Sequence, residues 1–87
     1  MATASHAVDE APTALTGLAN GTRYAIQNVG NRNVQIAEAA SAPDAGDHAL
    51  FLEPGEHWNR DLLPEAGLGI WVWCLNGESV VVTSEAE

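Results

Sequence analysis

The stretch Tyr24-Ala-Ile-Gln-Asn-Val-Gly30 decides the fold class, and Leu52-Glu-Pro-Gly55 and Ile70-Trp-Val-Trp-Cys74 support the same interpretation. Each has the residue pattern of a β-strand that ends in a turn or begins from one. In the first stretch, Tyr24 and Ile26 alternate with smaller or polar residues, so this face of the strand is predicted to point into a core. The three stretches together predict a small all-β module with abundant turns.

Similar patterns extend along most of the chain. We expect seven short strands, at residues 13–19, 22–29, 33–37, 48–52, 56–60, 68–75 and 78–83. Between them, Asn20-Gly21 and Asn76-Gly77 favour two-residue type I′ hairpins, and Pro54-Gly55 fits the centre of a type II turn. One competing segment, residues 35–41, has good helix propensity but is too short for an autonomous helix. The sequence therefore predicts an all-β fold, either a small antiparallel β-sandwich or an open barrel.

The length of the chain, 87 residues, limits the number of domains that it can form. A chain of this length forms one domain and buries only about 60–65% of the surface that its unfolded form exposes, so association would add to its stability. Residues 1–12 are small and polar and have no periodicity that could build a core face. We predict a flexible N-terminal arm at residues 1–12 and a β-sandwich domain at residues 13–87.

The charge balance is strongly acidic. Twelve Asp and Glu residues face three Arg residues, Lys is absent, and the formal net charge is -9. Such a field repels phosphate backbones and anionic lipid surfaces, and no apolar run approaches the length of a membrane span. We therefore expect neither a nucleic-acid partner nor a membrane partner. The acidity fits two roles, keeping an abundant protein soluble or attracting a cationic partner.

Residues that could carry chemistry are few and scattered. A nucleophile needs a base within hydrogen-bond reach and a third group that orients the base. The nearest approximation combines Ser79 or Cys74 with His57 and Asp61, without a nucleophile elbow or a Gly-rich phosphate loop. His48 and His57 are offset in register around the Pro-Gly turn and lack the clustered spacing of a metal site. The sequence predicts a protein that is not an enzyme, with no catalytic residue, metal or cofactor.

Three tryptophans are the candidate interface residues. Trp71 and Trp73 point to the same face of the predicted strand at residues 68–75, and Trp58 in the preceding strand is a candidate neighbour. Flat amphipathic rings supply much contact area at small entropic cost, so exposed tryptophans suit a protein interface or a carbohydrate-stacking platform. The alternative is that one or two of them fill the core. Cys74 is predicted to be a small buried side chain.

The blocks follow one another in a characteristic order: Tyr-x-Ile-Gln-Asn-x-Gly, a strand with Ala-Glu-Ala, Leu-x-Pro-Gly, a Trp-Val-Trp strand, and a valine-rich strand ending in Ser-Glu-Ala. Over residues 16–86 this order resembles small virion proteins of tailed bacteriophages that are taken to be head decoration, or cement, proteins. The resemblance implies a β-sandwich on the outer surface of the capsid, bound to the major capsid protein, commonly as a homotrimer at threefold positions. It implies assembly in the cytoplasm of the bacterial host and brings no catalytic or cofactor residues. The lack of Lys and the small-residue arm depart from the pattern.

Two function hypotheses of different classes follow. In the first, the protein is a capsid decoration protein that stabilises the head, docks through its less charged face and orders residues 1–12 on binding. In the second, it is a tail- or fibre-associated module that binds a receptor or glycan through Trp58, Trp71 or Trp73. Such modules are usually attached to a trimerisation stalk, and this sequence contains none. The first hypothesis is therefore preferred.

Overall fold

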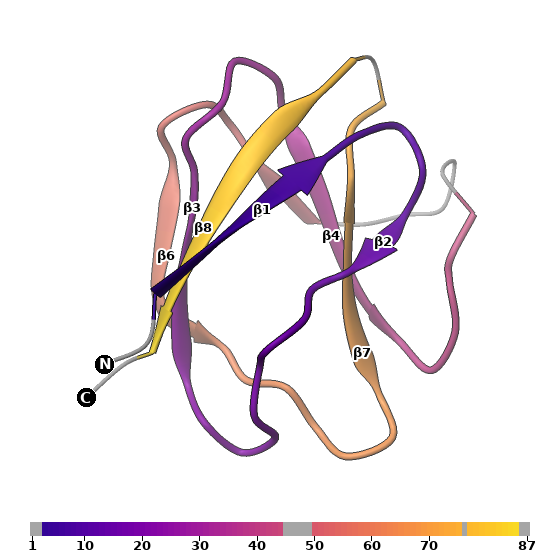
Figure 1. The fold of residues 1–87 in the computed structure, drawn as a ribbon, viewed down its shortest axis with the longest axis vertical. Coiled ribbons are helices and arrows are strands. Elements are labelled where there is room, and N and C mark those ends of the chain that lie inside the picture. Colours follow the sequence, from indigo (N-terminus) through magenta and orange to yellow (C-terminus); the bar gives the residue numbers. More distant parts are fainter. Residues whose placement is uncertain (1–2, 45–49, 76, 86–87) are drawn as a thin grey trace.

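Eight short strands form two four-stranded sheets that face one another (Figure 1). The computed structural model describes residues 3–44, 50–75 and 77–85, except for the side chains of Arg60 and Asp61. The strands are β1 (Thr3–Val8), β2 (Thr13–Ala14), β3 (Tyr24–Asn28), β4 (Val34–Ala39), β5 (Leu50–Leu52), β6 (His57–Leu62), β7 (Gly69–Trp73) and β8 (Ser79–Glu85). None of the described residues is helical, and the prediction of a small all-β sandwich is confirmed.

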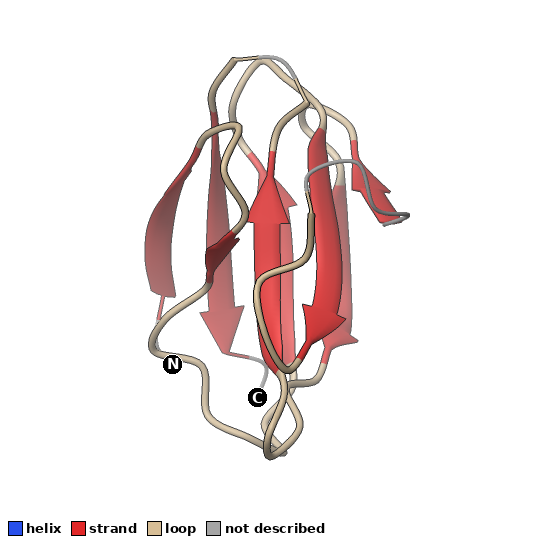
Figure 2. Ribbon diagram, turned by 90° about the vertical axis from the view of Figure 1, so that its right-hand side faces the viewer, coloured by secondary structure: helices blue, strands red, loops and turns tan. Residues whose placement is uncertain are grey.

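The order of the strands defines the topology. Sheet A has the order β1-β8-β3-β6, and sheet B has the order β2-β7-β4-β5, with every neighbouring pair antiparallel. Figure 2 shows the two layers from the side. Strands that are consecutive in sequence, such as β1 and β2 or β7 and β8, lie in opposite sheets, except for β4 and β5, which pair within sheet B. This arrangement of eight strands is that of a jelly roll, in which two Greek keys form the two sheets.

The core lies between the sheets and is built from alternate residues of the strands. Ile26 and Val81 contribute from sheet A, Val34 and Val72 contribute from sheet B, and all four are fully buried. Tyr24 shares the inward face with Ile26, as predicted, while Ala25 and Gln27, which alternate with them on β3, face outward. The hydrophobic alternation in the sequence therefore identified the core face of β3 correctly.

The two Asn-Gly dipeptides do not form the predicted hairpins. At Asn20-Gly21 a β-turn does close, because the Thr22 N–H donates to Ala19 O over 3.3 Å. The strands on either side of it, β2 and β3, nevertheless belong to different sheets, and so do β7 and β8 on either side of Asn76-Gly77. Asn76 itself lies outside the described residues. A type I′ signal fixes a local reversal of the chain, but it does not require that the next strand pairs with the previous one.

The Pro54-Gly55 turn is formed as predicted. Gly55 has a φ of 84°, and the Glu56 N–H donates to Glu53 O over 2.9 Å, as expected for a type II turn with Gly at its third position. The turn carries the chain from β5 in sheet B to β6 in sheet A. His57 consequently pairs with Gln27 of β3, and not with the end of β5.

The prediction of a flexible arm at residues 1–12 is wrong for most of that segment. Thr3–Val8 form β1, which pairs along its whole length with β8 at the edge of sheet A, and Val8 is fully buried in the core. Met1 lies outside the described residues. The strand predicted at 13–19 is short, because only Thr13–Ala14 pair with β7. The helical alternative at 35–41 is also wrong, since β4 continues to residue 39.

Candidate functional site

Four connections meet at one end of the sandwich, which we call the loop end. Its described residues are 9–12, 29–33, 53–56, 74–75 and 77–78, which belong to the connections from β1 to β2, β3 to β4, β5 to β6 and β7 to β8. Because neighbouring strands are antiparallel, all four crossings lie at the same end, uppermost in Figure 1. Loops on a rigid scaffold are common positions for binding residues, so this end is a candidate binding surface.

Asn28, the last residue of β3, is fully buried, and its side chain binds the loop at residues 29–33, the end of β5 and the start of β8, so that it ties three of the four connections together. Its Nδ2 donates to Arg32 O over 2.6 Å and to Leu52 O over 3.0 Å. Its Oδ1 accepts from the Gly30 N–H over 3.1 Å and from the Ser79 hydroxyl over 2.7 Å. Both donors and the acceptor of the amide are therefore satisfied, which is the usual condition for a buried polar side chain.

Gly30 explains the last position of the Gln-Asn-x-Gly block. A Cβ at Gly30 would overlap Ser79 Oγ and would lie only 2.7 Å from Val80 N. The loop after β3 therefore rests directly on the backbone at the start of β8, and this close approach requires glycine. The block that decided the fold class thus has a structural role, which is to fasten the loop end.

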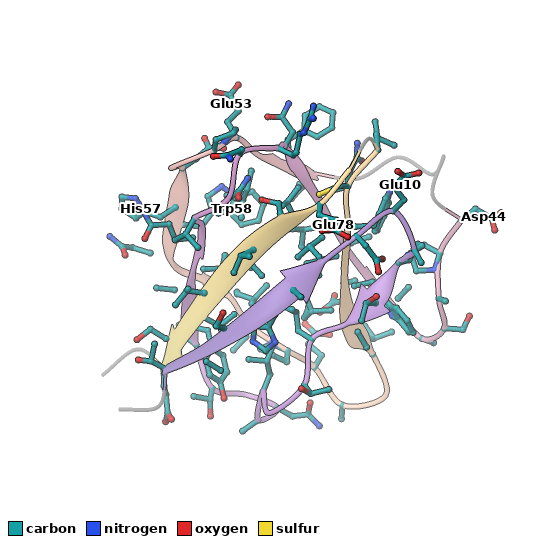
Figure 3. The ribbon with its side chains drawn as sticks, turned by 45° about the horizontal axis from the view of Figure 1, so that its top comes forward. Glu10, Asp44, Glu53, His57, Trp58 and Glu78 are labelled. Atoms are coloured by element: carbon teal, nitrogen blue, oxygen red, sulfur yellow. The ribbon has the colours of Figure 1, made fainter. Side chains whose placement is uncertain are left out.

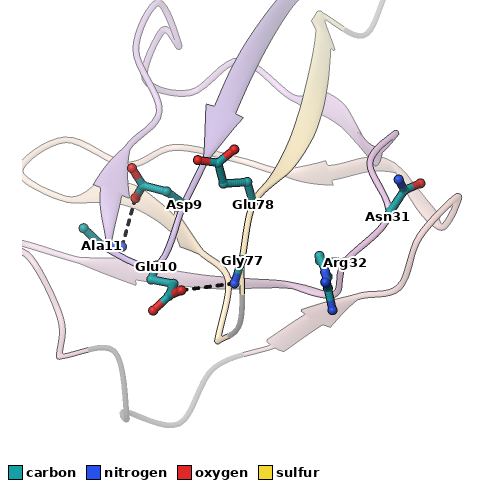
Figure 4. A pocket seen from close by; sticks show the side chains of 7 residues that line it. All are labelled: Asp9, Glu10, Ala11, Asn31, Arg32, Gly77 and Glu78. Atoms are coloured by element: carbon teal, nitrogen blue, oxygen red, sulfur yellow. Dashed lines mark hydrogen bonds between the residues drawn. The ribbon is translucent and has the colours of Figure 1, made fainter.

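The fourth loop is attached through the connection between β7 and β8. Glu10 Oε2 accepts from the Gly77 N–H over 3.2 Å, and Asp9 O accepts from the Cys74 N–H over 2.7 Å. Figure 4 shows the first of these contacts together with the hydrogen bond from Ala11 N to the Asp9 carboxylate. All four loops are consequently connected to one another, and the loop end is a preorganised surface.

The loop end is acidic. Its carboxylates belong to Asp9, Glu10, Glu53, Glu56 and Glu78, and its one described Arg side chain is Arg32. Asp9, Glu10 and Glu78 line an open hollow together with Arg32 (Figure 4), and Figure 3 shows Glu53 farther along the same end. Among the described residues, no group of three or more His, Cys, Asp or Glu side chains could hold a metal ion. The hollow is an open, charged surface with both acidic and basic side chains.

None of the three tryptophans is an exposed anchor. Trp58 is partly buried and packs against the core, and Trp71 is partly buried with its Nε1 donating to Ala39 O over 3.2 Å. Trp73 is fully buried, although it lies outside the core cluster. Trp71 and Trp73 do share one face of β7, as predicted, and this is the face of sheet B that points away from the core.

The large apolar side chains that are exposed are different residues. Phe51 and Leu75 are 55% and 53% exposed and line a shallow hollow beside Arg32 and Gln35. Leu50 is 65% exposed next to Phe51. The sequence contains a signal for Phe51, because it lies between two apolar residues of one strand and must point to the opposite face from Leu52, which is buried.

The outer face of sheet A has no charged side chain over three of its four strands. One row crosses the whole sheet, from Ser5 on β1 through Val82 and Gln27 to His57 on β6. The neighbouring outward residues are also uncharged; they are Thr3, Ala7, Ala25, Val80 and Ser84. In a chain with a net charge of -9, a continuous surface without a carboxylate is a distinctive feature. Depletion of charge is a property of the centre of protein interfaces.

The structure separates the residues of the nearest catalytic approximation. The Ser79 hydroxyl is buried and donates to Asn28, and Cys74 is buried in the core. His57 is exposed on the outer face of sheet A. The side chain of Asp61 and the whole of His48 lie outside the described part of the structure.

Among the described residues, two titratable groups have shifted pKa values, and burial is the main cause in both. Burial lowers the pKa of His6, whose Nε2 lies 3.0 Å from the Thr83 hydroxyl on the inner side of sheet A. Burial also raises the pKa of the Cys74 thiol, and the charge of Asp9 adds to this while Arg32 opposes it. The thiol is therefore held in its neutral, unreactive form.

Comparison of the chain with models of protein families, with curated proteins and with solved structures finds no match in any of the three. Within the described residues, no helix is long and apolar enough to cross a membrane.

Proposed function

We propose that this protein is a structural component of a tailed-phage virion, a decoration protein that binds the outer surface of the major capsid protein lattice and stabilises the head. The observation that supports docking is the outer face of β1, β8 and β3 in sheet A, which carries no charged side chain. The order of sequence blocks over residues 16–86, which resembles phage decoration proteins, supports the identity of the shell.

The distribution of charge favours docking through sheet A. The carboxylates of Asp9 and Glu78 lie at one end of this face, where they line a hollow together with Ala7 and Val80. The rows from Ser5 to Gln27 and from Thr3 to Ala25 carry no carboxylate, so a partner can contact them without the cost of burying unpaired charges. Val80 and Val82 supply apolar area at its centre, and Ser5 and Gln27 supply polar groups around it. Such a mixture is typical of interfaces that form between separately folded proteins.

The receptor- or glycan-binding alternative receives less support from the same structure. Carbohydrate stacking needs an accessible aromatic ring face. Trp73 is fully buried, and Trp58 and Trp71 are each partly covered by their own domain. The exposed aromatic side chain is Phe51, which stands beside Leu75 and not in a group of aromatic residues.

The proposal is tested on purified particles. Mass spectrometry should find many copies of the chain per particle, and stripped particles should release DNA at a lower temperature until the protein is added back. Gln27→Glu places a carboxylate at the centre of the sheet A face and should reduce particle occupancy. Asn31→Asp places the same charge on the loop end and should not. Unchanged heat resistance of stripped particles, with loss of adsorption to host cells, would contradict the capsid role and favour the receptor-binding alternative.

A further inference from the structure

The two sheets have four edge strands, and they differ in how well they are protected. β2 and β5 contain only two and three residues. β6 has an irregular register opposite β3 and carries Arg60 and Asp61. Short strands, bulges and charges are the usual means by which edge strands avoid pairing with other chains. Three of the four edges therefore have a recognisable protective feature.

β1 has none of these features. It pairs with β8 over six consecutive residues without a break in register, and no described strand pairs with its other side. Its sequence, Thr-Ala-Ser-His-Ala-Val, contains no Pro, Lys, Asp or Glu. Every residue on its outward side is exposed. Such a strand offers a row of backbone donors and acceptors to an added strand.

The faces of β1 restrict the register in which a second β1 could pair with it. Ser5 points outward beside Val82, whereas His6 points inward to the Thr83 hydroxyl. Opposed residues of an antiparallel pair point to the same side, so outward residues must oppose outward residues if the two sheets are to be continuous. An axis through Ser5 satisfies this condition, with Thr3 opposite Ala7 and Ala4 opposite His6.

The charges favour a second copy in this antiparallel arrangement. Asp9 and Glu10 follow β1 directly, at the acidic loop end. With Ser5 on the axis, Asp9 of each copy falls beyond Thr3 of the other, outside the paired segment. The two loop ends then lie at opposite ends of the contact. Two chains that each carry -9 therefore meet along the one long edge without carboxylates and keep their acidic ends apart.

We propose that two copies of the protein associate through antiparallel pairing of their β1 strands about a twofold axis at Ser5, which joins two sheets A into one eight-stranded sheet. A twofold interface uses the same patch on both copies, as this pairing does. The uncharged outer faces become one continuous surface. The proposal concerns the isolated protein and does not depend on the virion role.

The test is the mass of the full chain in solution as a function of concentration, measured by sedimentation velocity. We expect a monomer–dimer equilibrium with a dimer of twice the 9.1 kDa chain mass. Ser5→Glu sets two carboxylates opposite each other on the axis, and we expect the dissociation constant to rise about tenfold or more. Asn59→Glu, an exposed position on the opposite edge strand β6, is the matched control and should leave the constant unchanged.

Hydrogen exchange separates pairing of β1 from association by another surface. Amides of β1 that do not face β8 should become protected only at concentrations where the dimer forms, in the wild type and in Asn59→Glu but not in Ser5→Glu. Circular dichroism of both variants checks that the fold is retained. A monomer at all concentrations, a trimer, or a dimer that Ser5→Glu leaves intact would each overturn the proposal, whatever the result with phage particles.

Discussion

Replacing Asn28 by Asp is the most informative single change in this domain. It keeps the shape of the side chain but replaces the donor of two hydrogen bonds by an acceptor. The amide nitrogen now donates to Arg32 O over 2.6 Å and to Leu52 O over 3.0 Å. A carboxylate oxygen in its place would face both carbonyl oxygens with no proton to share. The bonds accepted by Oδ1 from Gly30 and Ser79 would remain in place.

The expected cost is large for a domain of this size. Each buried polar group that loses its partner costs about 1–3 kcal/mol, and two carbonyl groups lose theirs here. The added charge is fully buried, which increases the cost further. We expect the free energy of unfolding to fall by about 3–5 kcal/mol, which is a substantial part of the total of about 5–15 kcal/mol that is typical of single domains.

The loss of unfolding free energy in Asn28→Asp should depend on pH in a characteristic direction. Burial against two carbonyl oxygens should raise the folded-state pKa of the new carboxyl above its unfolded value of about 3.9. The deficit relative to wild type is therefore full above the raised pKa and shrinks as the pH falls through it, because a protonated carboxyl can donate again. Urea unfolding of wild type and variant at several pH values measures this difference.

Asn31→Asp is the matched control, because it makes the same chemical change at an exposed position of the same loop. Its effect on the free energy of unfolding should stay within about 0.5 kcal/mol. A loss below about 1 kcal/mol for Asn28→Asp, or a deficit that does not shrink in acid, would refute the assigned role of Asn28 at the loop end.

Three further predictions concern packing and titration. Gly30→Ala should destabilise the fold by about 2–4 kcal/mol, because the added Cβ would meet the backbone of β8. At Gly17 an added Cβ would meet no neighbouring atom, so Gly17→Ala should cost only about 1 kcal/mol, because of the positive φ of that residue. Thermal unfolding of the two variants measures the difference. The partly buried His6 has a lowered pKa, so its contribution to stability is full above the ordinary value of about 6.5 and is lost as the pH falls through the lowered folded value. The difference in unfolding free energy between wild type and His6→Gln should therefore shrink between about pH 7 and pH 5, and a constant difference would count against an imidazole that the fold holds neutral. The Cys74 thiol should react with a disulfide reagent at least about a hundredfold more slowly in the folded protein than in urea, and equal rates would show that it is accessible.

The sequence was a good guide to local structure and to the faces of the strands. The period-two pattern identified Tyr24 and Ile26 as core residues, and the Pro54-Gly55 turn has the predicted geometry. These features depend on neighbouring residues only. Assignment of strands to sheets depends on distant residues, and here the prediction of hairpins at the Asn-Gly dipeptides was wrong.

Burial outside the core was not predictable from alternation. The pattern at residues 33–37 predicts that Gln35 points outward, and it does lie opposite Trp73 on the outer face of sheet B. Both side chains are nevertheless buried there. Alternation tells which side of a sheet a residue occupies, but it does not tell whether another part of the chain covers that side. The candidate interface residue Trp73 is buried for this reason.

Residues 3–8 show why composition misjudged the N-terminal segment. Low hydrophobicity and small side chains indicate that a segment cannot build a core by itself, and this is correct for β1, in which Val8 is the one described core residue. A strand added to the edge of an existing sheet needs no core of its own, because its backbone hydrogen bonds and its side-chain contacts with β8 stabilise it.

The same argument applies to the free edge of β1, which does not pair with β8. If sheet A can order this strand through its backbone, a second β1 can extend the sheet by the same interactions, and shortening the chain by residues 1–8 should abolish dimerisation and expose Val81. Retention of a dimer by the shortened chain would place the contact elsewhere on the molecule.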